Sequence, residues 1–135
     1  PQKKQPRLPP LICLVEDDKP LRTVLARFLA RAGYDVVEAE HGREALQEMA
    51  VKPADLVITY MIMPEMDGVE TIVALRRDYP KVKIIAISGG GLRTADQYLQ
   101  LAQMLGAHKV FSKPILPQEL LNAISNLVEV ETQPS

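Results

Sequence analysis

Residues 11–18 read LICLVEDD, five apolar residues followed directly by three acidic ones, and this stretch decides the fold. An unbroken apolar run of this length is typical of a strand buried on both faces, as in a parallel sheet. The residues after it have helical spacing and stop before Gly33, as expected at a helix C-terminus. We expect one face of this helix to be buried, made of Leu21, Val24, Leu25, Phe28 and Leu29. A buried strand, an acidic turn and an amphipathic helix predict the first unit of an alternating α/β fold.

The same unit recurs along the chain. Further apolar runs that predict strands lie at Val36–Glu38, Leu56–Thr59, Lys83–Ile87 and Lys109–Phe111. Helical spacing follows each run, as in the segment that ends at Pro80, the one before Gly106 and the one opened by Pro117. Five strands alternating with five helices predict a doubly wound five-stranded parallel sheet with right-handed crossovers. Functional groups of such folds gather at the carboxyl ends of the strands.

Composition limits the class of protein. With 135 residues, 47% of them apolar, the chain has the size and core of one domain, which we place at residues 10–130. We expect residues 1–9 to form a flexible N-terminal tail and residues 131–135 a C-terminal tail. The 16 basic and 17 acidic residues nearly balance, which argues against direct binding of nucleic acid. A single cysteine, Cys13, and the lack of an apolar stretch of roughly 20 residues favour a cytoplasmic protein that does not enter the membrane.

Polar residues stand at the predicted strand ends. They are Glu16, Asp17 and Asp18 after the first strand, Tyr60 after the third, Ser88 after the fourth, and Lys113 after the fifth. Adjacent carboxylates suit Mg²⁺, which takes one or two protein carboxylates and keeps several waters. A lysine and a hydroxyl at neighbouring strand ends can hold phosphoryl oxygens, so the sequence predicts a phosphoryl-binding site. We interpret Asp18 chiefly as the cap of the following helix, and His41 and His108 as surface residues.

Four stretches are similar to the successive signatures of one family, in the same order and spacing. They are LICLVEDDKPLR (11–22), DLVITYMIMPEMDGVE (55–70), IIAISGG (84–90) and VFSKPI (110–115). Together they cover about residues 10–130, and they resemble the receiver domains of two-component response regulators. The resemblance implies a flavodoxin-like (βα)5 fold with strand order 2-1-3-4-5.

The resemblance also assigns roles to residues. Glu16 and Asp17 would bind Mg²⁺, with the backbone carbonyl of Ile62 completing the protein's ligands. Ser88 and Lys113 would contact the phosphoryl group, and Lys113 would precede its proline through a cis bond.

The chain departs from the family at Tyr60, four residues before Pro64, where the family has its phosphate-accepting aspartate. A phenol with a pKa near 10 cannot form an aspartyl phosphate and is a poor ligand for a hard cation. We therefore expect Mg²⁺ to bind more weakly and Lys113 to interact directly with the carboxylates of Glu16 and Asp17. Three interpretations stay open: a substitution introduced into a working receiver, a natural pseudo-receiver that signals by binding, and phosphorylation of Tyr60 by a separate kinase.

A second departure is Val110, which stands three residues before Lys113, where the family often has a mobile aromatic side chain. The resemblance implies a signalling module rather than an enzyme, which would interact with a histidine kinase or phosphotransfer protein. It would also meet a downstream protein, through the face of its fourth helix, fifth strand and fifth helix, as a monomer or weak dimer. The sequence does not separate a stand-alone receiver from a piece of a longer regulator.

The alternative is an enzyme of related topology, either a nucleotide-binding oxidoreductase or a magnesium-dependent phosphatase. A dinucleotide site needs glycines directly after the first strand, where this chain has acidic residues. A phosphatase of the relevant class needs its nucleophilic aspartate there, with a second aspartate two residues later. Neither pattern is matched well.

Overall fold

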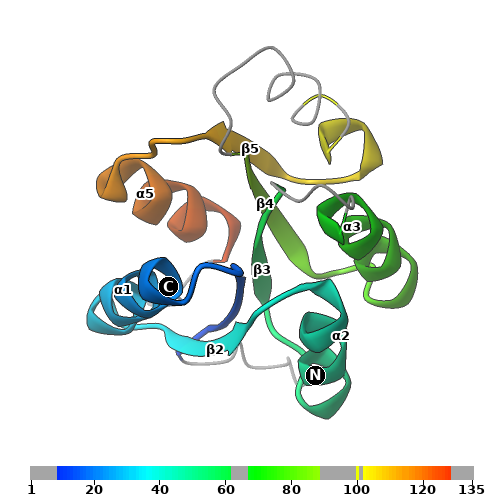
Figure 1. Cartoon of the computed structure of the whole chain (residues 1–135), viewed down its shortest axis with the longest axis horizontal. Coiled ribbons are helices and arrows are strands. Elements are labelled where there is room, and N and C mark those ends of the chain that lie inside the picture. The colour runs from blue at the N-terminus through cyan, green and yellow to red at the C-terminus, as the bar shows by residue number, and fades with distance from the viewer. Residues whose placement is uncertain (1–8, 62–66, 89–99, 101, 129–135) are drawn as a thin grey trace, which may run out of the picture.

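The structure is a computed structural model that describes residues 9–61, 67–88, 100 and 102–128. These residues form one parallel sheet of five strands in the order β2-β1-β3-β4-β5, as the resemblance implied (Figure 1). The strands are β1 (Leu11–Val15), β2 (Asp35–Ala39), β3 (Leu56–Tyr60), β4 (Lys83–Ser88) and β5 (Lys109–Ser112). The helices are α1 (Lys19–Arg31), α2 (Gly42–Val51), α3 (Asp67–Asp78) and α5 (Pro117–Leu127). Of the predicted fourth helix, residues 100 and 102–105 are described, and they are helical.

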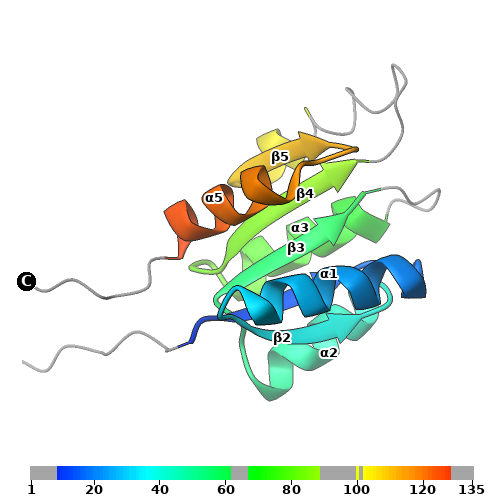
Figure 2. The same cartoon turned by 90° about the vertical axis from the view of Figure 1, so that its left-hand side faces the viewer.

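The helices cover both faces of the sheet. α1 and α5 lie on one face and α2 and α3 on the other, as the two views show (Figures 1 and 2). Side chains of β1 alternate between the two layers: Cys13 and Val15 join the core under α2 and α3, whereas Ile12 and Leu14 join the core under α1 and α5. The burial of β1 on both faces explains why its sequence is an unbroken apolar run.

The register aligns the carboxyl ends of the strands. Val15 of β1 pairs with both Ala39 of β2 and Thr59 of β3, and Ser88 of β4 pairs with Ser112 of β5. Tyr60 and Ser88 are the last residues of their strands rather than the first residues after them, because the strands run one residue further than the apolar runs predicted. Residues that end or follow the strands are therefore brought to one edge of the sheet.

The prediction for the buried face of α1 was wrong at one position. Val24 is 63% exposed, whereas Arg22 is 8% exposed, and the buried residues of the helix are Arg22, Ala26 and Leu29. The helix is rotated toward Arg22 because this side chain finds polar partners beneath it, which offset the cost of burying a charge.

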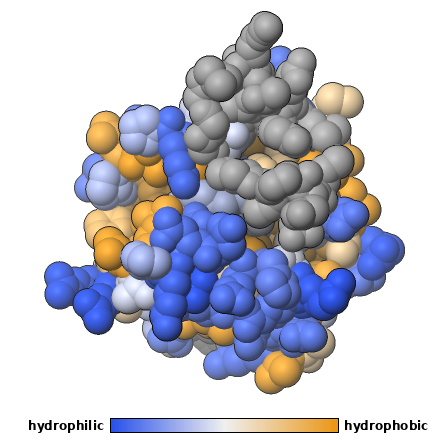
Figure 3. All heavy atoms as spheres, viewed as in Figure 1, coloured by the Kyte–Doolittle hydropathy of each residue, from blue (hydrophilic) through white to orange (hydrophobic). Residues whose placement is uncertain are grey.

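On the face shown in Figure 3, hydrophilic residues cover most of the described surface, and hydrophobic ones form small groups near its margins. Among the described residues, no helix is long and apolar enough to cross a membrane. The predicted tails fall outside the described residues except for Pro9.

Candidate functional site

Four of the predicted site residues meet at the carboxyl edge of the sheet. The ammonium Nζ of Lys113, just after β5, lies 4.0 Å from Oε1 of Glu16, just after β1. The same Nζ lies 4.6 Å from the ring centroid of Tyr60, at the end of β3. The backbone amide of Lys113 donates a hydrogen bond of 2.8 Å to the carbonyl of Ser88, at the end of β4. Segments far apart in sequence thus share one site because parallel strands end together.

Glu16 is a buried carboxylate with only 4% of its surface exposed. Its Oε2 accepts a 2.9 Å hydrogen bond from the backbone amide of Asp18. Its Oε1 is buried and has no hydrogen-bond partner among the residues that the structure describes. Burial raises the pKa of Glu16 above its ordinary value; the Asp18 amide and the Lys113 ammonium oppose this, and the neighbouring Asp17 carboxyl adds to it. Oε1 is therefore a carboxylate oxygen that is directed at a cation and is otherwise unsatisfied.

Tyr60 places a neutral aromatic ring at the end of β3, facing Lys113. Its side chain is 2% exposed and belongs to the core under α1 and α5. Burial, and secondarily the negative charge of Glu16, raises the pKa of the phenol, so it carries no charge at neutral pH. The ring faces the Lys113 ammonium in a cation–π contact, an interaction worth about 1 kcal/mol when partly desolvated.

The three acids after β1 have different surroundings. Asp18 caps α1, as predicted: its Oδ1 accepts a 3.2 Å hydrogen bond from the amide of Leu21. Asp17 is exposed, and its carboxyl lies close enough to that of Glu16 to affect its pKa. Glu16 and Asp17 are therefore the two carboxylates available to an added cation.

The donor set can be compared with the requirements of Mg²⁺. No group of three or more acidic, histidine or cysteine side chains is clustered within the described parts of the chain. The unsatisfied Oε1 of Glu16 and the exposed carboxylate of Asp17 nevertheless match a Mg²⁺ ion that takes two carboxylates and keeps its waters. The carbonyl of Ile62, predicted as a third ligand, lies outside the described residues.

The predicted switch residues flank this centre. Ser88 is 3% exposed, and the Lys113–Pro114 peptide bond is cis, as the resemblance implied. Val110 is half-buried on β5 and packs against the core under α2 and α3, whereas Phe111 packs on the opposite face of the sheet.

Arg22 and Glu38 are neighbours of the site that were not predicted from the sequence. The guanidinium of Arg22 donates from Nη1 to the backbone carbonyl of Glu16 at 2.7 Å and from Nε to Oε1 of Glu38 at 3.0 Å. The spacing of Arg22, Ala26 and Leu29 is itself the i, i+4, i+7 pattern of a buried helix face, so the signal was present but was overridden by the charge of Arg22.

The two histidines are exposed, as predicted. Each accepts a hydrogen bond through Nδ1, His41 from the amide of Glu44 and His108 from the amide of Ile84.

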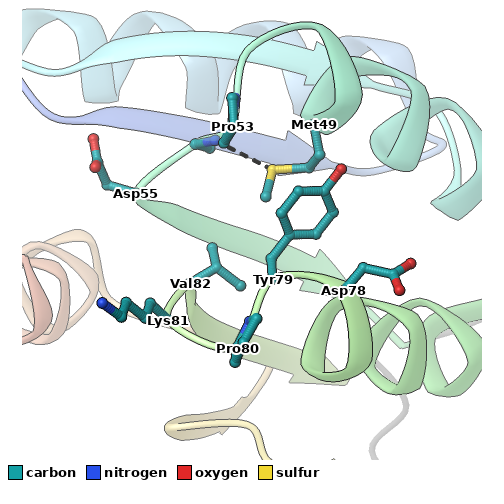
Figure 4. A pocket seen from close by; sticks show the side chains of 9 residues that line it. Met49, Pro53, Asp55, Asp78, Tyr79, Pro80, Lys81 and Val82 are labelled. Carbon is teal, nitrogen blue, oxygen red and sulfur yellow. Dashed lines mark hydrogen bonds between the residues drawn. The ribbon is translucent and has the colours of Figure 1, made fainter.

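A groove of about 430 Å³ opens at the opposite side of the sheet from the site, where the amino ends of β3 and β4 lie. Figure 4 shows the ring of Tyr79 beside Met49, whose Sδ accepts a 3.2 Å hydrogen bond from the amide of Ala54. The groove is lined by Met49, Pro53, Ala54, Asp55, Asp78, Tyr79, Pro80, Lys81 and Val82. These residues lie before β3 and β4, so the groove is not part of the site at the strand ends.

Comparison with known proteins supports one family. The model of the response regulator receiver domain matches residues 12–125. The response regulator receiver protein CpdR of Brucella abortus is 32% identical over 117 residues, which is 87% of this chain and 95% of that protein. The alkaline phosphatase synthesis transcriptional regulatory protein PhoP of Bacillus subtilis is 32% identical over 109 residues, 81% of this chain but only 44% of the regulator. A receiver domain protein from Clostridium thermocellum superposes with a TM-score of 0.80 at 26% identity, covering 88% of this chain and 94% of that one.

Proposed function

Because this chain belongs to the family of response-regulator receiver domains, the signalling modules of two-component systems, we propose that it signals through protein contacts without forming an aspartyl phosphate. The observation that carries the proposal is Tyr60, a buried neutral phenol at the acceptor position, with Lys113 over its ring. The similarities to receiver proteins give no support to the oxidoreductase or phosphatase alternative.

Members of the family typically bind Mg²⁺, and in this chain the ligands that we propose are Glu16, Asp17 and the carbonyl of Ile62. The unsatisfied Oε1 of Glu16 supports this assignment. Such an ion supplies positive charge that offsets the two carboxylates. Because Tyr60 contributes no third carboxylate, we expect the affinity to be lower than with aspartate at this position.

Ser88, Lys113 and Val110 are the residues that we propose to link the site to the surface. Lys113 contacts Glu16 and Tyr60 through its side chain and Ser88 through its backbone, so a change at the site reaches both β4 and β5. Val110 lies on β5, three residues before Lys113, and packs against the core under α2 and α3.

Receiver domains interact with histidine kinases and with downstream effectors. For this chain we propose a histidine kinase or phosphotransfer protein as one partner, and a downstream protein on the face of residues 102–105, β5 and α5. Two exposed apolar residues support that choice: Met104 (80% exposed) lies within residues 102–105, and Leu116 (61% exposed) is the N-cap residue that precedes α5. We propose a monomer or weak dimer.

The test compares three proteins: the unsubstituted chain, Tyr60→Asp, and Tyr60→Phe, which removes only the hydroxyl. Each is titrated with beryllofluoride and Mg²⁺, and binding is followed by fluorine NMR and by the backbone amide shifts of Ser88, Val110 and Lys113. We expect binding only to Tyr60→Asp, because beryllofluoride needs a carboxylate to complete a phosphoryl-like group.

Two results would overturn the proposal. One is a beryllofluoride response of the unsubstituted chain that equals that of Tyr60→Asp. The other is phosphorylation of the unsubstituted chain by a phosphotransfer protein or kinase, detected by mass spectrometry, with Tyr60 as the modified residue. If Tyr60→Asp also stays silent, the domain has lost more of its phosphoryl chemistry than the acceptor, and signalling by contact gains further support.

A further inference from the structure

Arg22 is a buried cation directly behind the acidic turn. It stands in the first turns of α1 and is 8% exposed, although it carries a full positive charge. Nη1 donates to the carbonyl of Glu16 at 2.7 Å, and Nε donates to Oε1 of Glu38 on β2 at 3.0 Å. A buried guanidinium is costly without partners, so its burial here depends on these two contacts.

The contacts of Arg22 complete a clamp around Glu16. The amide of Glu16 donates to the carbonyl of Ala39 on β2 at 3.0 Å, and its Oε2 accepts from the amide of Asp18 at 2.9 Å. With Arg22 on the carbonyl, three of the polar groups of Glu16 are fixed. The fourth, Oε1, is left without a hydrogen bond and lies 4.0 Å from Lys113.

We propose that Arg22 is a positioning residue that orients the peptide between Glu16 and Asp17, and through it both carboxylates, toward a bound cation. Glu38 holds the guanidinium in place from the neighbouring strand. The inference rests on the proposed function in one respect, since it takes Glu16 and Asp17 as the ligands of the cation. Partners of this kind, one shell beyond the ligands, typically change metal affinity by about 10- to 100-fold.

Charge and geometry give opposite expectations for Arg22. If its only effect were that of a nearby positive charge, removing it would strengthen the binding of a cation. If it positions the ligands, removing it weakens that binding. Arg22→Met removes both donors and the charge, whereas Arg22→Lys keeps the charge but cannot reach both partners with a planar fork. Arg27→Met is the matched control, because Arg27 is an exposed arginine on the same helix.

The experiment measures Mn²⁺ and Mg²⁺ affinity by calorimetry in the Tyr60→Asp background and in the unsubstituted chain, at a temperature where every variant is folded. We expect Arg22→Met to lower the affinity about tenfold, Arg22→Lys to lower it by less, and Arg27→Met to leave it unchanged. In Glu38→Gln, Arg22 keeps its hydrogen bond to the carbonyl of Glu16 but loses its ion pair with residue 38. We therefore expect a smaller loss of metal affinity than in Arg22→Met. Unchanged or tighter binding by a folded Arg22→Met variant would overturn the inference.

A second readout needs no metal. The amide of Asp18 donates to Oε2 of Glu16, so its hydrogen exchange reports whether the acidic turn keeps its shape. We expect its exchange to accelerate at least tenfold in Arg22→Met relative to other amides of α1, and an unchanged rate would contradict the clamp. If no variant binds metal, the proposed ligand role of Glu16 and Asp17 fails, and the Asp18 amide then decides the inference about Arg22 alone.

Discussion

Replacing Lys113 by methionine removes the ammonium group that lies 4.0 Å from Oε1 of Glu16 and 4.6 Å from the ring centroid of Tyr60. Two unit charges at this separation interact by about 4 kcal/mol at an effective dielectric constant of about 20. The Lys113 side chain is 32% exposed, so solvent screening reduces this, and we take about 2 kcal/mol. Removing the ammonium therefore raises the pKa of Glu16 further, because the carboxylate loses its neighbouring cation. Loss of the cation–π contact adds about 1 kcal/mol that does not depend on pH.

The sign of the pH dependence follows from the raised pKa of Glu16. The folded chain keeps this proton at pH values where the unfolded chain has lost it, so stability falls as pH rises from about 4.3 toward the folded pKa. Removing Lys113 raises the folded pKa further and widens that window upward. We expect Lys113→Met to lose about 1 kcal/mol of unfolding free energy at pH 4, where the raised pKa keeps Glu16 of the folded chain protonated, and about 3 kcal/mol at pH 8.

Urea unfolding followed by circular dichroism, with a chelator present, measures both values. Lys109→Met, on the strand that Lys113 follows, is the matched control, because its Nζ lies 5.8 Å from the Phe111 ring centroid and the ion pair of Glu16 is made by Lys113. The loss of unfolding free energy in Lys109→Met should be the same at pH 4 and pH 8. An equal loss for Lys113→Met at pH 4 and pH 8 would refute the electrostatic account of the site.

The remaining predictions concern the scaffold. Gly106→Ala should destabilise the fold by about 3 kcal/mol, because its φ is +119° and a Cβ would lie 2.5 Å from Cδ of Arg76. Gly33→Ala, at φ +104° with open space around the Cβ, should cost only about 1 kcal/mol in the same urea assay; equal losses would contradict the clash. Burial raises the pKa of the Cys13 thiol to about 12, so iodoacetamide should label it at pH 8 only after unfolding. Rapid labelling of the native chain would contradict this and show that the core around β1 opens. Burial and neighbouring cations lower the pKa of His108, so the folded chain resists a proton that the unfolded chain takes up below about pH 6.5, and stability should fall on acidification. His108→Gln should make that fall in stability between pH 7 and pH 5 smaller, and an unchanged fall would assign it to other groups.

Much of the fold could be predicted because the strands are buried on both faces. Their apolar runs located every strand to within one residue at each end, and alternation with helices left one sheet type. The rotation of α1 was not predictable in the same way. Hydrophobic spacing placed Val24 inside and overlooked Arg22, whose burial depends on partners contributed by the acidic turn and by β2.

The site was predictable in outline for a topological reason. Parallel strands end at one edge, so Glu16, Tyr60, Ser88 and Lys113 had to be neighbours there. Sequence could not tell which oxygen of Glu16 would be left unsatisfied, since that depends on the Asp18 amide and the Arg22 clamp. Nor could it show that the ring of Tyr60 would lie beneath Lys113, which is a matter of side-chain packing. The binding roles of these residues remain predictions.

Glu16 and Lys113 lie near opposite ends of the domain in sequence, and their contact therefore affects the order in which the protein folds. The bonds of the acidic turn to α1 and β2 are local in sequence and close only short loops. Lys113 arrives only when β5 has joined the sheet, and long-range pairing of this kind is slow because a long loop must first be closed. Until then the carboxylate of Glu16 is partly desolvated but lacks the neighbouring ammonium of Lys113, which is energetically unfavourable. We therefore expect the docking of β5 to be the step that neutralises the site, so that partly folded chains lacking this strand gain little from an already formed acidic turn.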